Sequence, residues 1–235
     1  KKKKMSTRNR IKEAIERSVK KTKAQQKEYL LFGRIIVYVN GELTQGVSMD
    51  DTIKRVEETI PAHLMDEIDS IFIGYFEENE ERALEAHYDS GAIYISNLLD
   101  RDFDFLENII HEASHAVEKQ HGLQIYGDRK IEIEFAGKRK RLKSILKNEG
   151  FSVDAYDFMN TEYNETFDNF LYKEVGYSKL GSAVMGLFVS PYAATSLEEY
   201  WAVGFEDYFV GDREYLKKIS PQLFNKIKEI KDDIE

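Results

Sequence analysis

The sequence predicts an α+β fold in which a small mixed β-sheet with an edge strand precedes a long central helix and a helical C-terminal lobe. Before residue 97, β-branched and aromatic residues cluster in short segments separated by turn residues, which is typical of strands. From about residue 104 onward, apolar residues recur mainly at helical spacing. No internal repeat or Pro/Gly/Ser-rich linker divides the 235 residues, so we expect one main domain.

Four segments in the first part of the chain are expected to form strands: 34–39, 70–76, 83–88 and 92–96. Asp89-Ser90-Gly91 is a turn sequence that joins the last two segments as a hairpin. Between the first and second strands, residues 48–60 are expected to form a helix. Ser48 or Asp50 is the expected N-cap, and Pro61 stands near the end.

The second half is expected to be helical apart from one hairpin. The central helix is predicted from about Asp104 to Gln120. Residues 130–135 and 138–142 flank Ala136-Gly137 and are expected to pair as two strands. Further helical segments are expected at 143–148, 154–160, 164–174, 178–189, 196–210, 212–218 and 221–233.

Residues 1–27 differ in charge from the main domain, 28–235, and are expected to form a basic helix or arm. They contain twelve Lys and Arg against two Glu, so they carry +10, while the rest of the chain carries −19 of the total −9. Such an arm can bind nucleic acid or another anionic surface. Alternatively, it can pack Ile11, Ile15 and Val19 on its own domain. The absence of interleaved aromatic residues favours packing on the domain.

Several classes of protein are disfavoured by composition. No run of about 18 apolar residues occurs, and no apolar region follows the basic start, so we expect neither a membrane span nor a signal peptide. The chain has no cysteine, which excludes a disulfide scaffold and cysteine-ligated zinc. The localisation stays open, and both a cytoplasmic protein and part of a larger viral or toxin chain are compatible with the sequence.

The central helix contains an H-E-x-x-H motif, His111-Glu112-Ala113-Ser114-His115. Histidines four residues apart project from one helix face, so both can bind one metal ion. Glu112 lies close to that face and can reach a water molecule at the metal without being a ligand. The pattern predicts Zn²⁺ held by His111 and His115, with Glu112 as the general base. The alternative is a solvated helix face on which two histidines occur by chance.

Catalytic zinc usually has three protein ligands, and the sequence offers two candidates for the third. His121 matches the metzincin spacing H-E-x-x-H-x-x-G-x-x-H, with Met185 as a possible Met-turn. However, Glu118 stands where that motif has glycine. On a continuous helix, His121 points roughly 120° away from His115. The second candidate is Glu199, which an expected capping box of Thr195 and Glu198 leaves facing inward.

Residues 192–205 read Tyr-Ala-Ala-Thr-Ser-Leu-Glu-Glu-Tyr-Trp-Ala-Val-Gly-Phe. This segment resembles the catalytic segment of the anthrax lethal factor and Pro-Pro endopeptidase group of gluzincins, in which a tyrosine and Glu-aromatic-aromatic-Ala-x-x-Phe follow an H-E-x-x-H-A-V helix. Residues 111–117 are similar to that helix motif. The resemblance implies a zincin active helix, Glu199 as the third zinc ligand and Tyr192 as the phenol that stabilises the oxyanion. It departs at Val203, where the group has an acid.

The motif and the resemblance predict a zinc-dependent endopeptidase with a peptide or protein substrate. Glu112 would accept a proton from the attacking water, and Tyr192 would share the charge of the oxyanion with the metal. The strand Ala92-Ile93-Tyr94-Ile95-Ser96 is expected to be the edge strand that pairs with an extended substrate, unless it is an ordinary interior strand. The sequence is also compatible with a non-catalytic binding or assembly module of the same fold, and with a nucleic-acid-associated protein.

Overall fold

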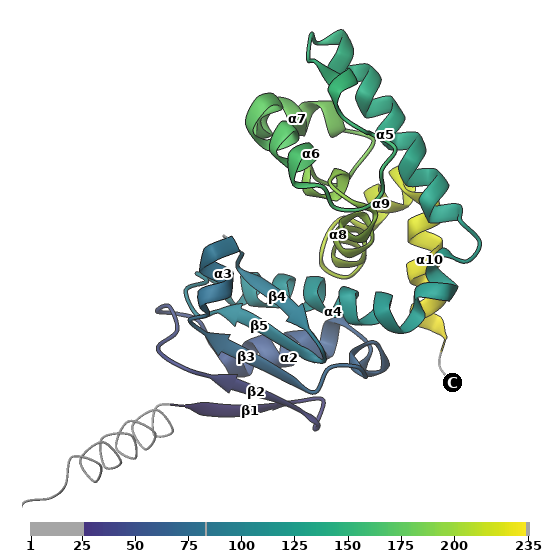
Figure 1. The fold of residues 1–235 in the computed structure, drawn as a ribbon. Helices are drawn as coiled ribbons and strands as arrows, with labels where there is room; N and C mark the ends of the chain where they lie inside the picture. The colour runs from purple at the N-terminus through teal and green to yellow at the C-terminus, as the bar shows by residue number, and fades with distance from the viewer. Residues whose placement is uncertain (1–25, 83, 234–235) are drawn as a thin grey trace, which may run out of the picture.

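A five-stranded mixed sheet in the order β1-β2-β3-β5-β4 forms one side of the structure (Figure 1). The computed structural model describes residues 26–82 and 84–233. β2, β3 and β5 are parallel, whereas β1 and β4 are antiparallel to their neighbours and form the two edges. The strands are β1 (Lys27–Leu31), β2 (Ile35–Val39), β3 (Ser70–Gly74), β4 (Ala86–Asp89) and β5 (Ala92–Ser96).

Aliphatic and aromatic residues alternate along the central strands, and this alternation decides which face of the sheet is buried. The helices α2 (Met49–Thr59) and α4 (Asp102–Tyr126) cover one face. The side chains on that face are aliphatic and buried: Val37, Val39, Ile71, Ile73, Ile93 and Ile95. Because successive strand residues point to opposite sides, Tyr38, Phe72 and Tyr94 lie on the other face. They are only partly buried there.

The second half of the chain forms a helical lobe around α5 (Lys130–Asn148), as Figure 1 shows. Arg139 of α5 is buried, and its Nη1 donates to the carbonyl oxygen of Ala194 at 2.6 Å. Its Nε donates to the carbonyl oxygen of Phe158 at 3.2 Å. One buried guanidinium thus connects α5 to the segments that lead into α8 (Leu197–Val210). The remaining elements are η1 (Ala62–Met65), α3 (Glu77–Arg82), η2 (Val153–Ala155), α6 (Glu165–Asn169), the π-helical turn η3 (Phe170–Val175), α7 (Tyr177–Val184), η4 (Tyr192–Ala194), α9 (Arg213–Ile219) and α10 (Pro221–Asp232).

Most of the elements predicted from periodicity are confirmed, including the strands at 34–39 and 70–76 and the hairpin that ends at 92–96. Ser48 is the N-cap of α2, and its side chain accepts from the Asp51 amide. The predicted basic arm at 1–27 falls almost entirely outside the described residues. Strand β1, which begins at Lys27, was not predicted.

The predicted hairpin over 130–142 is wrong, because this segment is the first part of α5. Its buried apolar residues Ile131, Phe135, Leu142 and Leu146 lie on one helical face, and burial of that face outweighs the local β-branched character. Gly137 is accommodated within the helix, with nothing within 4 Å of the place of a Cβ. Within the described ranges, no helix is both long and apolar enough to cross a membrane.

Candidate metal centre

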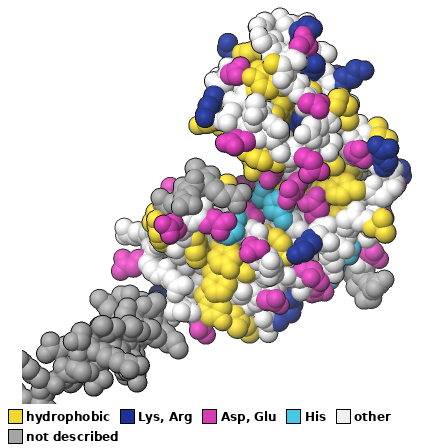
Figure 2. All heavy atoms as spheres, in the orientation of Figure 1, with side chains coloured by type: hydrophobic (Ala, Val, Ile, Leu, Met, Phe, Trp, Pro, Cys, Tyr) yellow, Lys and Arg dark blue, Asp and Glu magenta, His cyan; other side chains and the backbone are white. Residues whose placement is uncertain are grey.

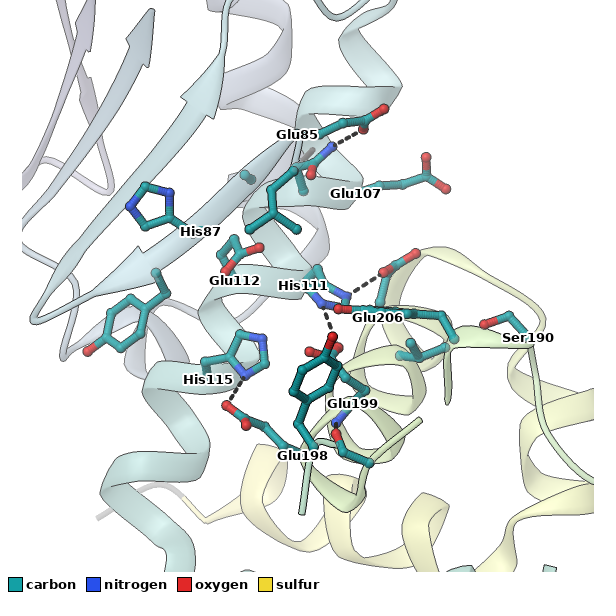
Figure 3. Close-up of a pocket in the computed structure, with 18 of the residues that line it drawn as sticks. Glu85, His87, Glu107, His111, Glu112, His115, Ser190, Glu198, Glu199 and Glu206 are labelled. Carbon is teal, nitrogen blue, oxygen red and sulfur yellow. Dashed lines mark hydrogen bonds and ion pairs between the residues drawn. The ribbon is translucent and has the colours of Figure 1, made fainter. Parts of the chain in front are cut away.

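The H-E-x-x-H motif and the segment around Glu199 meet where α4 packs against α8 (Figure 3). The indole Nε1 of Trp201 donates to the carbonyl oxygen of Ser114 at 3.0 Å, and both groups are buried. This hydrogen bond ties α8 to α4 in the middle of the motif. The rings of His111 and His115 project from α4 toward the first turn of α8, with their centroids 5.4 Å apart.

The start of α8 decides where Glu199 points. Ser196 is the N-cap, and its Oγ accepts from the Glu199 amide at 3.1 Å. The predicted capping box of Thr195 and Glu198 is therefore wrong. Thr195 precedes the cap, and its Oγ1 donates to the carbonyl oxygen of Tyr192 at 2.8 Å. Because the helix begins one residue later than expected, Glu199 is its third residue, and its carboxylate lies between the helices.

His111, His115 and Glu199 form a candidate three-ligand site. Each offers one ligand atom, and these atoms lie within 4.8 Å of one another. Glu199 Oε2 is 3.3 Å from His111 Nε2, and it is buried without a hydrogen-bond partner among the residues described. Two imidazoles and a carboxylate are ligand types that Zn²⁺ takes in tetrahedral sites with one open position. The unsatisfied carboxylate oxygen therefore fits a metal ligand.

A carboxylate stands behind each histidine, on the Nδ1 side. Glu206 Oε2 lies 2.9 Å from His111 Nδ1, which leaves Nε2 facing Glu199. His115 Nδ1 lies 3.4 Å from Glu198 Oε1 and 3.9 Å from Glu118 Oε2. A carboxylate behind a ligating histidine orients the ring and increases its basicity. Glu206 was not predicted. The available signal was its position seven residues, or two helical turns, after Glu199.

The charges around the two histidines favour a cation at this place. Burial by itself lowers the pKa of His111, but the nearby carboxylates of Glu199 and Glu206 outweigh it and raise the pKa to about 10. Burial raises the pKa of Glu199 too, but His111 and His115 outweigh burial and lower it. Positive charge in this pocket is thus stabilised by the surrounding acids, which is what a divalent ion requires.

The Glu112 side chain lies next to the candidate ligands and lines the same cleft. Its side chain is buried, and it accepts a hydrogen bond from the Tyr88 backbone in β4. Burial raises the pKa of the Glu112 carboxyl above its ordinary value, and the charges of His115 and His111 offset this only in part. A carboxylate with a raised pKa is a stronger base than one in water.

Tyr192 lies over His111, with the two ring centroids 6.3 Å apart. It belongs to η4, immediately before α8, and its hydroxyl interacts with the Glu199 carboxylate. Burial, followed by the charge of Glu199, raises the pKa of the phenol, so it stays protonated at neutral pH and can donate a hydrogen bond. Two further tyrosines lie elsewhere: the Tyr200 hydroxyl donates to Glu134 at 2.8 Å, and Tyr94 stacks on the open sheet face.

The structure does not bring His121 to the two motif histidines. α4 departs from helical geometry at His121 (φ −107°, ψ 16°), and its Nδ1 lies 3.3 Å from Gln124 Oε1. Met185 follows α7 and is 74% exposed, so it is neither core filling nor the floor of a metal site. A second possible group, His115 with Glu118 and Glu198, shares one histidine with the first and includes the exposed Glu198.

The candidate ligands open into a cleft of about 1150 Å³ between the sheet and the helical lobe. Figure 2 shows histidine and acidic side chains gathered at this hollow. No Lys or Arg of the described chain lines it. Nine acidic side chains do: Glu85, Glu107, Glu112, Glu165, Asp168, Glu198, Glu199, Glu206 and Asp207.

The strand beside the cleft is β4 and not β5. The predicted edge strand, Ala92-Ile93-Tyr94-Ile95-Ser96, is an interior strand that pairs with β3 on one side and β4 on the other. Its main chain has no free edge for a peptide, so the prediction that it binds substrate by strand addition is wrong. β4 is the true edge, and its residues Ala86, His87 and Tyr88 line the cleft.

Comparison of the chain with family models, with curated proteins and with solved structures gives no match. The functional assignment therefore depends on the motif and on the geometry of the site.

Proposed function

We propose that this protein is a zinc-dependent endopeptidase of the gluzincin type, with a zincin active helix in α4. The observation that carries the proposal is the approach of His111 and His115 from α4 to Glu199 from α8, with their ligand atoms within 4.8 Å. These ligands come from segments far apart in sequence, and their convergence beside Glu112 in a cleft matches the needs of metal-assisted peptide hydrolysis.

Zn²⁺ bound by these three residues would polarise the scissile carbonyl group and lower the pKa of a water molecule toward ~7. Glu112 accepts a proton from the attacking water on its carboxylate and passes it to the nitrogen of the leaving amine. The Tyr192 hydroxyl donates a hydrogen bond to the oxygen that becomes negative. Glu206 holds the His111 ring through Nδ1, so that Nε2 stays directed at the site.

The free edge of β4 supports an extended peptide as the substrate. An edge strand presents unpaired N–H and C=O groups, to which a peptide can add as another strand. β4 runs along the cleft, and its Tyr88 backbone contacts Glu112. A peptide paired with the β4 edge would therefore lie in the cleft that the candidate ligands line.

Metal analysis and a peptide-library cleavage profile of the purified chain test this function together. We expect about one zinc per chain and cleavage that a chelator abolishes. Glu112→Gln should retain zinc and lose turnover, because Glu112 is a base and not a ligand. Glu107→Gln is the matched control, since Glu107 lies five residues earlier on α4 and also lines the cleft. Full activity in Glu112→Gln, or a chain that binds no zinc, would overturn the proposal.

A further inference from the structure

Arg139 in α5 is a buried cation that joins two distant pieces of the helical lobe. It is 1% exposed, and its guanidinium donates to four backbone carbonyl oxygens. Nη1 donates to Ala194 at 2.6 Å and to Thr195 at 3.2 Å. Nε donates to Phe158 at 3.2 Å, and Nη2 donates to Asn160 at 3.1 Å. One side chain thus holds these two pieces of chain together.

Among the described residues, the guanidinium of Arg139 contacts carbonyl oxygens and aromatic rings and forms no ion pair with a carboxylate. Its Cζ lies 3.9 Å from the ring centroid of Phe167 in α6 and 5.2 Å from that of Phe135. Burial lowers the pKa of Arg139 to about 10, so the group keeps its charge at neutral pH. A buried charge is costly unless hydrogen bonds satisfy it, and here the backbone of the two segments supplies them. The charge and the path of the two segments therefore depend on each other.

The two segments lead into the parts of the candidate metal centre that come from the helical lobe. The carbonyl groups of 194–195 stand between Tyr192 and Ser196, the N-cap of α8. Thr161 directly follows the other segment, and its carbonyl oxygen accepts from the Leu197 amide at 2.8 Å. The first residue of α8 is thus anchored to the chain that Arg139 holds.

The start of α8 sets the place of two groups at the site. Glu199 is the third residue of the helix and Tyr192 lies just before it, so both move with this junction. His111 and His115 belong to α4, so a shift of the junction changes their distances from Glu199. Misplacement by about 1 Å can reduce turnover by about 10²-fold. We propose that Arg139 is a positioning residue that keeps Glu199 and Tyr192 in place at the metal centre. Its importance for zinc binding rests on the proposed function.

Replacement of Arg139 by lysine tests the geometry of its donors apart from its charge. A guanidinium has five N–H groups in a fixed planar fork, whereas a lysine ammonium donates from a single atom. Arg139→Lys keeps the positive charge and loses the fork that spans the two segments. We expect zinc affinity to fall at least about tenfold, as for loss of a residue that supports a metal ligand. Competition with a chromogenic chelator measures the affinity.

Leu146→Ala is the matched control for general loss of stability. It leaves a cavity two turns further along α5 and removes none of the four hydrogen bonds. Its zinc affinity should stay within about twofold of the unmodified chain, because distant sites act independently. Unchanged zinc affinity in Arg139→Lys, or equal losses in both variants, would overturn the proposal.

Hydrogen exchange of the Leu197 amide tests the positioning without any metal. Its bond to Thr161 should open more readily in Arg139→Lys, with exchange at least about tenfold faster relative to amides of β2 and β3. Leu146→Ala should show no selective effect at Leu197. If the unmodified chain binds no zinc, the proposed function fails, and this exchange alone decides whether Arg139 holds the junction. An unchanged rate at Leu197 would overturn its positioning role.

A second variant serves if Arg139→Lys does not fold. Phe167→Leu keeps Arg139 and removes only the ring under its guanidinium. We expect a smaller loss of zinc affinity of the same kind, about threefold, because one cation–π contact is lost. Zinc affinity equal to that of the unmodified chain in Phe167→Leu would contradict the proposal in the same way.

Discussion

At the scale of single residues, a carboxylate of α8 lies beside each ring nitrogen of His111. Glu206 lies 2.9 Å from Nδ1, and Glu199 lies 3.3 Å from Nε2. The first distance is that of a hydrogen bond. The second joins two groups that can share a metal but make no hydrogen bond in good geometry. Glu206 thus orients the His111 ring through a hydrogen bond, and this orientation directs Nε2 toward Glu199, the other acid of α8.

Replacement of each of the two candidate third ligands should affect zinc affinity very differently. Glu199→Ala removes one of three protein ligands, so we expect zinc affinity to fall by more than about 100-fold, beyond the loss typical for a supporting residue. His121→Ala should leave zinc affinity nearly unchanged, because His121 contacts Gln124 and not the site. Competition with a chromogenic chelator measures both. The reverse result would assign the site to the metzincin spacing.

Tyr192→Phe tests the role of the phenol at the site. The ring would keep its place before α8, so folding and zinc content should not change. Turnover should fall by about 10²–10³, the range for loss of one oxyanion donor. Steady-state kinetics with metal content measured on the same preparation separates the two effects. Equal turnover in Tyr192→Phe and the unmodified chain would reduce Tyr192 to a packing residue.

Asp207 should make the free energy of unfolding depend on pH. Burial raises its pKa to about 6, above the value of about 3.9 in an unfolded chain. Between the unfolded and folded pKa values, the folded state binds the Asp207 proton more tightly than the unfolded state does. The stability that this protonation contributes therefore declines as pH rises and is fully lost above pH 6. Asp207→Asn removes the buried charge and keeps an acceptor for the Asp212 amide.

We therefore expect Asp207→Asn to increase the free energy of unfolding by about 1 kcal/mol near pH 7.5 and to have little effect near pH 4. The side chain is only partly buried, so solvent reduces the effect below the full pKa shift. Urea unfolding at the two pH values measures the difference. A variant that is destabilised equally at both would show that the Asp207 charge is not the cause.

At the scale of elements, α8 is held by close packing on two sides. Trp201 bonds to α4, and a Cβ on Gly204 would lie 2.3 Å from Leu223 Cδ2 of α10. The small residue therefore allows α10 to pack on α8 at short distance. This packing fixes the rotation of α8 and, through it, the direction of Glu199.

Gly204→Ala should overpack this contact and lower the free energy of unfolding by about 1–3 kcal/mol. Gly137→Ala is the matched control, because Gly137 lies inside α5 with open space around it. It should stabilise the chain by about 0.5–1 kcal/mol through higher helix propensity. Thermal unfolding measures both. A neutral Gly204→Ala would show that Leu223 moves away at little cost.

At the scale of the whole molecule, the acidic body and the acidic cleft favour cationic ligands. Nine carboxylates line the cleft, with no Lys or Arg of the described chain among its walls. We expect Glu112→Gln protein to bind a Lys/Arg-rich peptide at least about tenfold more tightly than its Gln-substituted counterpart. Binding should weaken steeply toward about 0.5 M salt. Glu165→Gln/Asp168→Asn should reduce the preference, and equal binding of both peptides would contradict it.

What the sequence determined by itself is local. Helical periodicity places His111 and His115 on one face and Glu112 beside it, whatever the helix packs against. Strand alternation separates buried Val37 from the outward Tyr38 in the same way. These relations involve residues a few positions apart, so the geometry of one element decides them.

Only the tertiary structure decided which distant residues meet. Helical spacing puts Glu206 on the same face as Glu199, but its contact with His111 depends on how α8 packs against α4. The strand order that makes β4 rather than β5 the edge does not follow from a local period either. The hairpin predicted within α5 was wrong because burial of one helical face outweighed local propensity. Strand order and helix rotation result from packing between segments far apart in the chain, and that packing is a property of the whole core.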